Sequence, residues 1–427
     1  MTSITGLEPA PKRVRKPVLG DPGLALSTVS RNLFGLLLAI GIVLGGGTQN
    51  GIWTDSLIEL LLIPMVIWGA WHMSHSRLSV SVKILSVVIL FVLLAQFLPF
   101  APPLALPDFN GTASGQMFWS ASPSRALEAF FFGVTCVGVF WFVGNLETRE
   151  QIALLRFVFL AVGIHCMLAI VQLSYDSQSN FETVLPFTIR AGLFANENHF
   201  STLLSMMIPL LAWRYAIVSR HLWAFLLVSI LIAGLLFAAG SRAGMAFASS
   251  LVVLSLFWLQ FRSLHPIVKL GVLAIVIVLG FTGLVFSDAE EAIQQDLRSL
   301  YFANTWEAIK DHWIFGTGLG TFVAVYPLYE AREEIVSVYA NHAHNDYLEL
   351  MLEGGLMFLI PMVSGAVLIV LRALKKNRMD VLALSLAPVL VHSIVDYPLR
   401  TFAVALVFSV LAAMVFSRRS PSDRFGY

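Results

Sequence analysis

The sequence predicts an all-α polytopic membrane protein, because of its composition and its recurring long apolar runs. Of its 427 residues, 57% are hydrophobic and 12% are charged, and the mean hydropathy is +0.80. A soluble protein carries about twice that charged fraction. Apolar runs of about 17 to 25 residues, the length that a bilayer-spanning helix requires, recur along the chain. Cys136 and Cys166 both lie inside such runs, so we expect them to act as small buried hydrophobic residues.

The chain divides into two polar tails and one transmembrane domain. Residues 1–30 are basic and rich in proline and glycine, and no A-x-A cleavage pattern follows the first apolar run. We therefore expect a retained cytoplasmic tail rather than a signal peptide. The transmembrane domain covers 31–417, and 418–427 form a second cytoplasmic tail. About twelve transmembrane helices are predicted, at 32–48, 52–71, 80–99, 124–144, 152–174, 195–213, 222–239, 243–260, 266–286, 348–371, 380–396 and 401–417.

The distribution of Lys and Arg predicts that both termini are cytoplasmic. With the N-terminus inside, most of the 27 Lys and Arg residues fall in the tails, the cytoplasmic connections or the adjoining helix ends. The positive-inside rule predicts such an asymmetry. The basic residues left on the outer side are Arg125, Arg190, Arg242, Arg298, Lys310, Arg332 and Arg400.

The outer loop 287–347 is large enough to have structure of its own. Apolar residues between Ile293 and Ala308 keep helical spacing against charged neighbours, which predicts a short amphipathic helix on the membrane surface. The G-x-G-x-G run at Gly316–Gly320 follows a helix and opens no βαβ unit. We therefore interpret it as a turn that returns the chain to the membrane, and not as a nucleotide-binding fingerprint.

Titratable residues cluster where this loop enters the next span. On a helix, His342, Asp346, Glu349 and Glu353 would share one face, and His344 would lie on a neighbouring face. Uncompensated charges are costly at such a boundary, so the cluster indicates a functional site. The alternative is an acidic helix start that favours the positive end of the helix dipole. No fourth ligand accompanies His342, Asp346 and Glu349, so we expect no metal site.

Arginines border several of the outer segments. Guanidinium is always charged and binds phosphate oxygens bidentately, so an arginine cluster at the interface suits a lipid that carries a diphosphate. The alternative for each is a snorkelling arginine, or one paired with a carboxylate. Asp396 is then the expected partner of Arg400 or Arg242. The membrane-embedded His199 and His392 are more often packing residues than catalysts.

Several segments together resemble the bacterial O-antigen ligase and O-antigen polymerase superfamily of membrane glycosyltransferases. They occur in the family's order, over about half of the chain and on the predicted outer side. The segments are R-x-G-x-F-x-N-x-N-H from Arg190, S-R-A from Ser241, Arg298 with Trp306 and the turn at 316–322, H-N-D-Y-L-E from His344 with E-x-G at Glu353, and H-S-x-x-D-x-P-L-R from His392.

The resemblance implies transfer of a glycan from an undecaprenyl diphosphate carrier to an acceptor hydroxyl, at the periplasmic face of the inner membrane. An inverting single displacement is implied, with neither metal nor cofactor. His344, or second to it His342, would be the general base. The diphosphate would be bound by Arg190, Arg242 and Arg298, joined by Arg400. Supporting roles fall to Asn345, Asp346, Glu349, Glu353, Asp396, Asn198 and His199.

Two alternative functions stay open. A polymerase of the same superfamily would use the same machinery with a different acceptor, another carrier-linked repeat in place of lipid A-core. A transporter of lipid-linked glycan or solute would also have many spans and intramembrane charges, but it predicts two related halves and charges near the bilayer centre. Here the charges gather at one face. The expected partners are a lipid-linked donor, a glycan or glycolipid acceptor and membrane lipids, with no nucleic acid.

Overall fold

The chain is helical throughout the part that the structure describes. The computed structural model describes residues 23–48, 51–99, 118–174, 190–219, 221–260, 265, 267–268, 271–272, 289–335, 340–374 and 380–417. Over these residues the structure is helical or irregular, apart from two isolated bridges that join Leu24 to Leu146 and Leu78 to Ser417. The predicted all-α class is therefore confirmed. The predicted tails lie mostly outside the described residues, and the division into domains stays a prediction.

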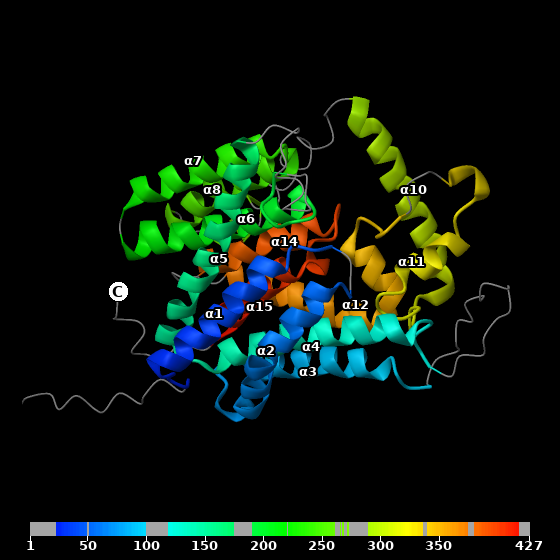
Figure 1. Ribbon diagram of the computed structural model, residues 1–427, viewed down its shortest axis with the longest axis horizontal. Coiled ribbons are helices and arrows are strands. Elements are labelled where there is room, and N and C mark those ends of the chain that lie inside the picture. Colours follow the sequence, from blue (N-terminus) through cyan, green and yellow to red (C-terminus); the bar gives the residue numbers. More distant parts are fainter. Residues whose placement is uncertain are drawn as a thin grey trace, which may run out of the picture.

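The helices of the first 260 residues form most of the bundle in Figure 1. They are α1 (Thr28–Leu44), α2 (Trp53–Trp71), α3 (Val80–Ala95), α4 (Pro123–Asn145), α5 (Thr148–Ser174), α6 (Glu197–Leu211), the π-helical turn η3 (Ala212–Val218), α7 (Leu222–Ala238) and α8 (Arg242–Gln260). The second half adds α10 (Ala289–His312), α11 (Phe322–Val325), α12 (Asp346–Ala373), α13 (Asp380–Ala383), η6 (Leu384–Leu386), α14 (Ala387–His392), η7 (Pro398–Arg400) and α15 (Phe402–Phe416).

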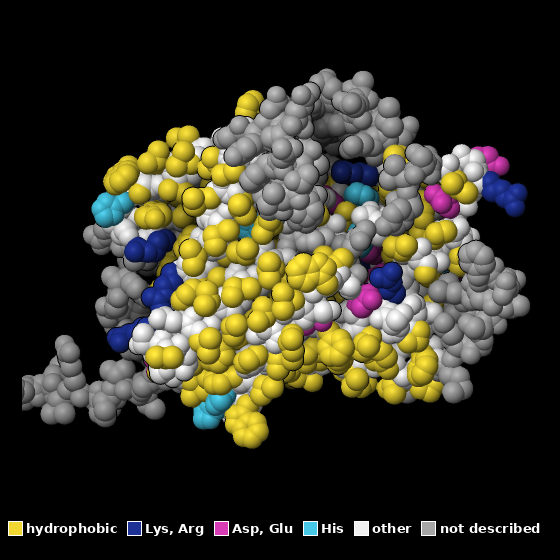
Figure 2. Space-filling model, viewed as in Figure 1, with side chains coloured by type: hydrophobic (Ala, Val, Ile, Leu, Met, Phe, Trp, Pro, Cys, Tyr) yellow, Lys and Arg dark blue, Asp and Glu magenta, His cyan; other side chains and the backbone are white. Residues whose placement is uncertain are grey.

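The helix lengths and composition fit a membrane protein. Four described helices, α2, α4, α5 and α12, are long and apolar enough to cross a bilayer, and five shorter apolar helices accompany them. In Figure 2 hydrophobic side chains cover most of the middle of the visible face, whereas charged and histidine side chains gather toward its ends. The number of twelve spans stays a prediction, and most of the span expected at 266–286 lies outside the described residues.

The span expected at 380–396 is not one helix. Its residues form the short pieces α13, η6 and α14, and the last helical residue is His392. Pro388 lies in the first turn of α14. Proline is tolerated there because the first backbone amides of a helix have no hydrogen-bond acceptor within the helix. A single straight helix over 380–396 is therefore a wrong prediction. The break matters for function, because it leaves residues 393–400 as a loop against the start of α12.

Two helices, α6 and α15, lie in the centre of the bundle and are buried on all sides. Every residue of α6 from His199 to Leu211 is buried, and so is nearly all of α15. A helix that is apolar all round is typical of a protein interior. The two helices begin at the same end of the bundle, where the His199 Nδ1 and Thr401 Oγ1 atoms are 2.7 Å apart. At this end the Ala403 amide also donates to the Gly45 carbonyl, just after α1 (2.8 Å).

A small second core lies beside the start of α12. It is formed by α10, α11 and the loop before α12, and in Figure 1 α10 and α11 stand at one end of the molecule. The predicted helix in the large loop is therefore confirmed, while its place on a membrane surface stays a prediction. The core residues are Tyr301, Ala308, Ile309, Phe322, Val325, Tyr326, Ala343 and Leu352.

The glycine-rich turn closes this core against α12. The amides of Thr317 and Gly318 donate to the carbonyls of Leu352 (2.9 Å) and Glu353 (2.8 Å). At Gly355 helix α12 departs from helical geometry (φ 58°, ψ −160°), and the Leu356 amide donates to Trp313 instead (2.9 Å). The turn thus replaces hydrogen bonds that the break removes from α12. The prediction that Gly316–Gly320 forms a turn is confirmed, and that this turn returns the chain to the membrane stays a prediction.

Candidate functional site

Helix α12 begins at Asp346 because Asn345 caps it. The Asn345 Oδ1 accepts hydrogen bonds from the amides of Tyr347 and Leu348 (both 3.0 Å), as an N-cap side chain does. Its Nδ2 donates to the carbonyl of Ile394 (2.8 Å), which ties the helix start to the 393–400 loop. His342 and His344 therefore precede the helix. The prediction that His342 shares a helical face with the acids is wrong, since the helix starts four residues later.

The three acids of α12 do share one face, and that face meets Arg400. The guanidinium Nη2 lies 2.8 Å from a Glu353 oxygen and 3.4 Å from a Glu349 oxygen, and Nε lies 3.8 Å from Asp346 Oδ1. All three carboxylates are buried, and the Arg400 side chain is 10% exposed. Burial opposes the charge of Arg400, but the three carboxylates outweigh it and raise the pKa of this residue.

His342 joins this ion cluster as a cation. Its Nδ1 lies 2.8 Å from Glu349 Oε1, and its Nε2 lies 3.0 Å from the Thr48 carbonyl oxygen. Both partners are acceptors, so both ring nitrogens donate, as only the protonated imidazole can. Burial disfavours that form, yet the Glu349 carboxylate outweighs the burial and raises the pKa of His342. A histidine held in this way already carries its proton.

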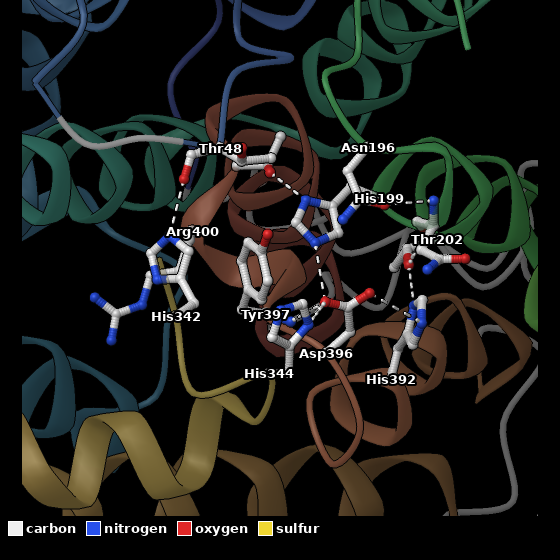
Figure 3. A network of polar contacts seen from close by, with 12 residues as sticks. Thr48, Asn196, His199, Thr202, His342, His344, His392, Asp396, Tyr397 and Arg400 are labelled. Carbon is white, nitrogen blue, oxygen red and sulfur yellow. Dashed lines mark hydrogen bonds and ion pairs between the residues drawn. The ribbon is translucent and has the colours of Figure 1, made fainter. Parts of the chain in front are cut away.

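A second cluster gathers three histidines around one buried carboxylate, Asp396 (Figure 3). The Oδ1 atom lies 3.6 Å from His199 Nε2 and 3.6 Å from His344 Nδ1, and Oδ2 lies 3.9 Å from His392 Nε2. These distances are long for hydrogen bonds, so the attraction is mainly electrostatic. His199 and His392 are almost fully buried, whereas the side chain of His344 is 22% exposed. Of the three rings around Asp396, that of His344 is the one open to a substrate.

Tyr397 separates the two clusters. Its ring centroid lies 4.2 Å from that of His342, 4.8 Å from that of His199 and 5.0 Å from that of His344. Burial and the Asp396 charge raise the pKa of Tyr397 to about 12, so the phenol stays neutral. The ring therefore fixes the spacing of the imidazoles rather than exchanging a proton with them.

The backbone of His344 is in the left-handed region, with φ 49°. A non-glycine residue there is strained by about 1–2 kcal/mol. Its ring stacks on Tyr301 of α10, with centroids 5.9 Å apart and planes 19° apart. Strain of this kind persists only where surrounding contacts hold it, and such positions cluster at functional sites. The geometry of His344 is thus set by α10 on one side and by Asp396 on the other.

The predicted arginines do not all have the same surroundings. Arg298 lies on α10 three residues before Tyr301, whose ring stacks on His344, and its charge acts on His392. Arg190 is exposed, and the nearby Gly192 is fixed by hydrogen bonds with Gln172 (2.8 and 2.9 Å). Arg242 is the first residue of α8, and its side chain lies outside the described part of the chain.

The expected pairing of Asp396 with Arg400 is wrong. Asp396 contacts histidines, and Arg400 contacts the acids of α12, because the turn of η7 carries Arg400 past Asp396 to the other side of Tyr397. The charge of Arg400 is therefore matched within the protein. Whether Arg400 also contacts a diphosphate stays a prediction, as do the roles of Arg190, Arg242 and Arg298.

Asn198 and His199 bring the start of α6 into the site. The Ser241 hydroxyl, just before α8, donates to Asn198 Oδ1 (3.2 Å), so the two predicted motifs meet there. Thr202 and Thr401 hold the far nitrogens of His392 and His199 at 2.5 and 2.7 Å. These threonines, with Tyr397, Tyr301 and Thr48, were absent from the residues predicted from the sequence. Only Tyr397 had a signal, since it stands inside the H-S-I-V-D-Y-P-L-R segment.

The arrangement suits acid–base chemistry next to a bound anion. The described residues form no group of three or more His, Cys, Asp or Glu side chains placed to hold a metal ion. They offer instead an exposed imidazole backed by a buried carboxylate, the pair that enzymes use to orient a general base. Arg298, on α10, adds a positive charge that acts on the His392 side of this cluster.

The comparison with protein families agrees with this site. Residues 227–363 match the model of a family described as O-antigen ligase. No curated protein matches the chain. The matched segment includes α10, the glycine-rich turn, His342, His344 and the acids of α12. Over residues 227–363, about a third of its length, this chain is therefore similar to the O-antigen ligase family.

Proposed function

We propose that the protein is a glycosyltransferase that moves a glycan from an undecaprenyl diphosphate carrier to an acceptor hydroxyl, with an O-antigen ligase type of acceptor such as lipid A-core. The observation that carries the proposal is the partly exposed His344, backed by the buried Asp396 and stacked on Tyr301 of α10, the helix that also carries Arg298. The similarity of residues 227–363 to the O-antigen ligase family supports a membrane glycosyltransferase in general. In the proposal, the protein lies in the bacterial inner membrane and its site faces the periplasm.

His344 is the general base in this proposal. Its Nδ1 faces Asp396, which favours a proton on that nitrogen and leaves Nε2 to accept the proton of the acceptor hydroxyl. The protonated ring that forms is then stabilised by the Asp396 carboxylate. His342 is the weaker candidate, because both of its nitrogens already donate, to Glu349 and to Thr48.

The reaction proposed is a single displacement at the anomeric carbon. The acceptor oxygen forms a bond to this carbon on one face as the bond to the carrier phosphate breaks on the other, so the configuration inverts. The electron pair leaves with the diphosphate, and the proton goes to His344. Arg298, Arg190 and Arg242 would stabilise the charge that grows on the leaving group. Arg400 and the acids of α12 would hold the site in shape.

The test is glycan transfer by the full-length protein in detergent, with a defined undecaprenyl diphosphate glycan. His344→Gln should lower the rate by about 10²–10⁴-fold, the usual contribution of a general base. Arg298→Met should also lower the rate strongly, without loss of folded protein. His342→Gln should retain more activity than His344→Gln. Full activity in both His344→Gln and Arg298→Met would refute the assignment.

Two acceptors in the same assay separate the alternatives. Transfer to lipid A-core supports the ligase, and transfer only to a second carrier-linked repeat would assign the protein as a polymerase. Detergent micelles enclose no compartment, so any transfer in them excludes a protein that only transports. Cys166→Ala is the control variant, because Cys166 lies in α5 and packs against the apolar core of the bundle.

A further inference from the structure

The second half of α5 holds residues 190–196, the segment that carries Arg190 and leads into α6. Gln172 forms two hydrogen bonds with the backbone of one residue of this segment. Its Nε2 donates to the Gly192 carbonyl (2.8 Å), and its Oε1 accepts from the Gly192 amide (2.9 Å). An amide side chain carries a donor and an acceptor side by side, so it can pair with both groups of one residue. Gln172 therefore fixes both the place and the direction of the backbone at Gly192.

His165, two turns earlier on α5, holds the next residues. Its Nε2 lies 3.1 Å from the Ile42 carbonyl oxygen and therefore carries the ring proton, while its Nδ1 accepts from the Leu193 amide (3.3 Å). The ring also packs against that of Phe194, with centroids 4.8 Å apart. Residues seven apart on a helix share one face, so His165 and Gln172 point to the same side of α5. Together they hold consecutive residues of the segment against this helix.

Gly192 lies so close to α5 that a side chain would not fit. Its φ is 68°, in the left-handed region, and a Cβ there would meet the His165 carbonyl oxygen at 2.8 Å. Glycine tolerates both the φ angle and the close approach. The residue at this position therefore suits the paired hydrogen bonds with Gln172.

The end of the segment is fixed as well. The Ala195 amide donates to the carbonyl of Gly46, just after α1 (2.9 Å). Asn196 Oδ1 then accepts from the Asn198 amide (2.8 Å) and caps α6. Arg190, at the start of the segment, is exposed. An exposed arginine has many rotamers, so the place that its guanidinium can reach depends mainly on where its backbone is held.

We propose that Gln172 and His165 are positioning residues for glycan transfer, which hold the 190–196 segment so that Arg190 meets the donor diphosphate. The proposal rests on the proposed function for the role of Arg190. Neither Gln172 nor His165 touches the substrate in this proposal. Release of the segment would let Arg190 move away from the phosphate on which charge grows, and a displacement of about 1 Å at a reacting group can cost about 10²-fold in rate.

The first measurement is hydrogen exchange in the full-length protein in detergent, followed by mass spectrometry. Gln172→Met keeps the length of the side chain and removes both hydrogen bonds, so the amides of residues 192–195 should exchange at least tenfold faster. Gln151→Met is the matched control. Gln151 is buried on the same helix, and its Nε2 donates to the Val143 carbonyl (2.8 Å) and to the Ser417 hydroxyl (2.9 Å). It precedes Gln172 by 21 residues, roughly 30 Å along α5, so its loss should leave the exchange of 192–195 unchanged.

The second measurement is a double-mutant cycle in the transfer assay. Gln172→Met should lower kcat/KM for the donor about tenfold when Arg190 is present, and less than twofold in an Arg190→Met background, because the positioned group is then gone. A merely structural role of Gln172 would lower kcat/KM equally in both backgrounds. Gln151→Met should change kcat/KM less than twofold in either background.

The outcomes separate this proposal from the proposed function. Equal losses in the two backgrounds, or unchanged exchange of 192–195 in Gln172→Met, would overturn the positioning role while an active wild type upholds the proposed function. A wild type that transfers no glycan would refute the proposed function, and the exchange measurement alone would then decide whether α5 holds the segment. If Gln172→Met does not fold, His165→Phe takes its place, because a phenyl ring keeps the packing on Phe194 and removes the hydrogen bond from Leu193.

Discussion

Replacement of Arg400 by methionine should destabilise the protein more than replacement of any exposed arginine. Methionine keeps an unbranched side chain of about the length that reaches Arg400 Nε but removes the guanidinium, which leaves the carboxylates of Asp346, Glu349 and Glu353 buried without their cation. Removal of one partner from a buried ion pair costs about 3–5 kcal/mol. Since three carboxylates lose their shared cation, we expect a cost near the upper end of that range. In this variant the positive charge of His342 lies next to Glu349 and still offsets the negative charge of that carboxylate.

The measurement is unfolding by sodium dodecyl sulfate in mixed micelles, followed by tryptophan fluorescence. Arg125→Met is the matched control, because the Arg125 side chain is 51% exposed and pairs with Glu128 at 3.2 Å, the ion pair found for it among the described residues. Exposed pairs contribute about 0–1 kcal/mol. Adding Glu353→Gln to Arg400→Met should recover part of the loss, because one buried charge disappears. A loss of less than about 1 kcal/mol in Arg400→Met would refute the view that this cluster stabilises the start of α12.

Three further outcomes follow from single contacts. Gly355→Ala should prevent folding at 37 °C in an expression assay, because Gly355 has φ 58° and a Cβ there would overlap the Ile314 carbonyl, whereas Gly365→Ala in the same helix should be tolerated. The stability that His342 gains from Glu349 should be complete below a pH of about 6.5, where the unfolded ring is also charged. Because the folded pKa is raised, this gain is lost as the pH rises through it, so the difference in melting temperature between wild type and His342→Gln should shrink at alkaline pH. Tyr397→Phe should retain transfer activity and Tyr397→Ala should lose it, because the ring spaces the imidazoles while its hydroxyl has a weak contact, 3.3 Å from Asn341 Nδ2.

Local patterns in the sequence were sufficient to predict the long apolar helices. The apolar runs anticipated α2, α4, α5 and α12 within a few residues, because a bilayer-length run has few other structures open to it. The shared face of Asp346, Glu349 and Glu353 followed from helical periodicity alone. The amphipathic pattern before Gly316 likewise anticipated α10.

The partners of the charged residues could not be predicted in this way. Periodicity places acids on a face but does not say which distant residue meets that face. Arg400 is 47 residues from Glu353, and the pairing depends on the break of 380–396 into short helices. The same break turns Asp396 toward His199 and His344 instead of toward an arginine. The cap at Asn345 was also missed, and with it the fact that His342 lies outside the helix.

The two clusters have different consequences for a reaction. Around Arg400, all three acids of α12 have short contacts within the protein: Glu353 with Arg400 and the Phe322 amide, Glu349 with the Ala343 amide, and Asp346 with the Leu399 amide. This cluster can therefore hold α12 and η7 together before any substrate binds. Around Asp396, three imidazoles compete for one carboxylate at distances longer than hydrogen bonds. The Asp396 carboxylate can therefore stabilise the positive charge on the His344 ring when that ring accepts a proton. Because the cluster around Arg400 holds the surrounding elements in place, the site would not need to reorganise during this step. The catalytic advantage of the fold would then lie in keeping these two kinds of contact apart, with the ring of Tyr397 between them.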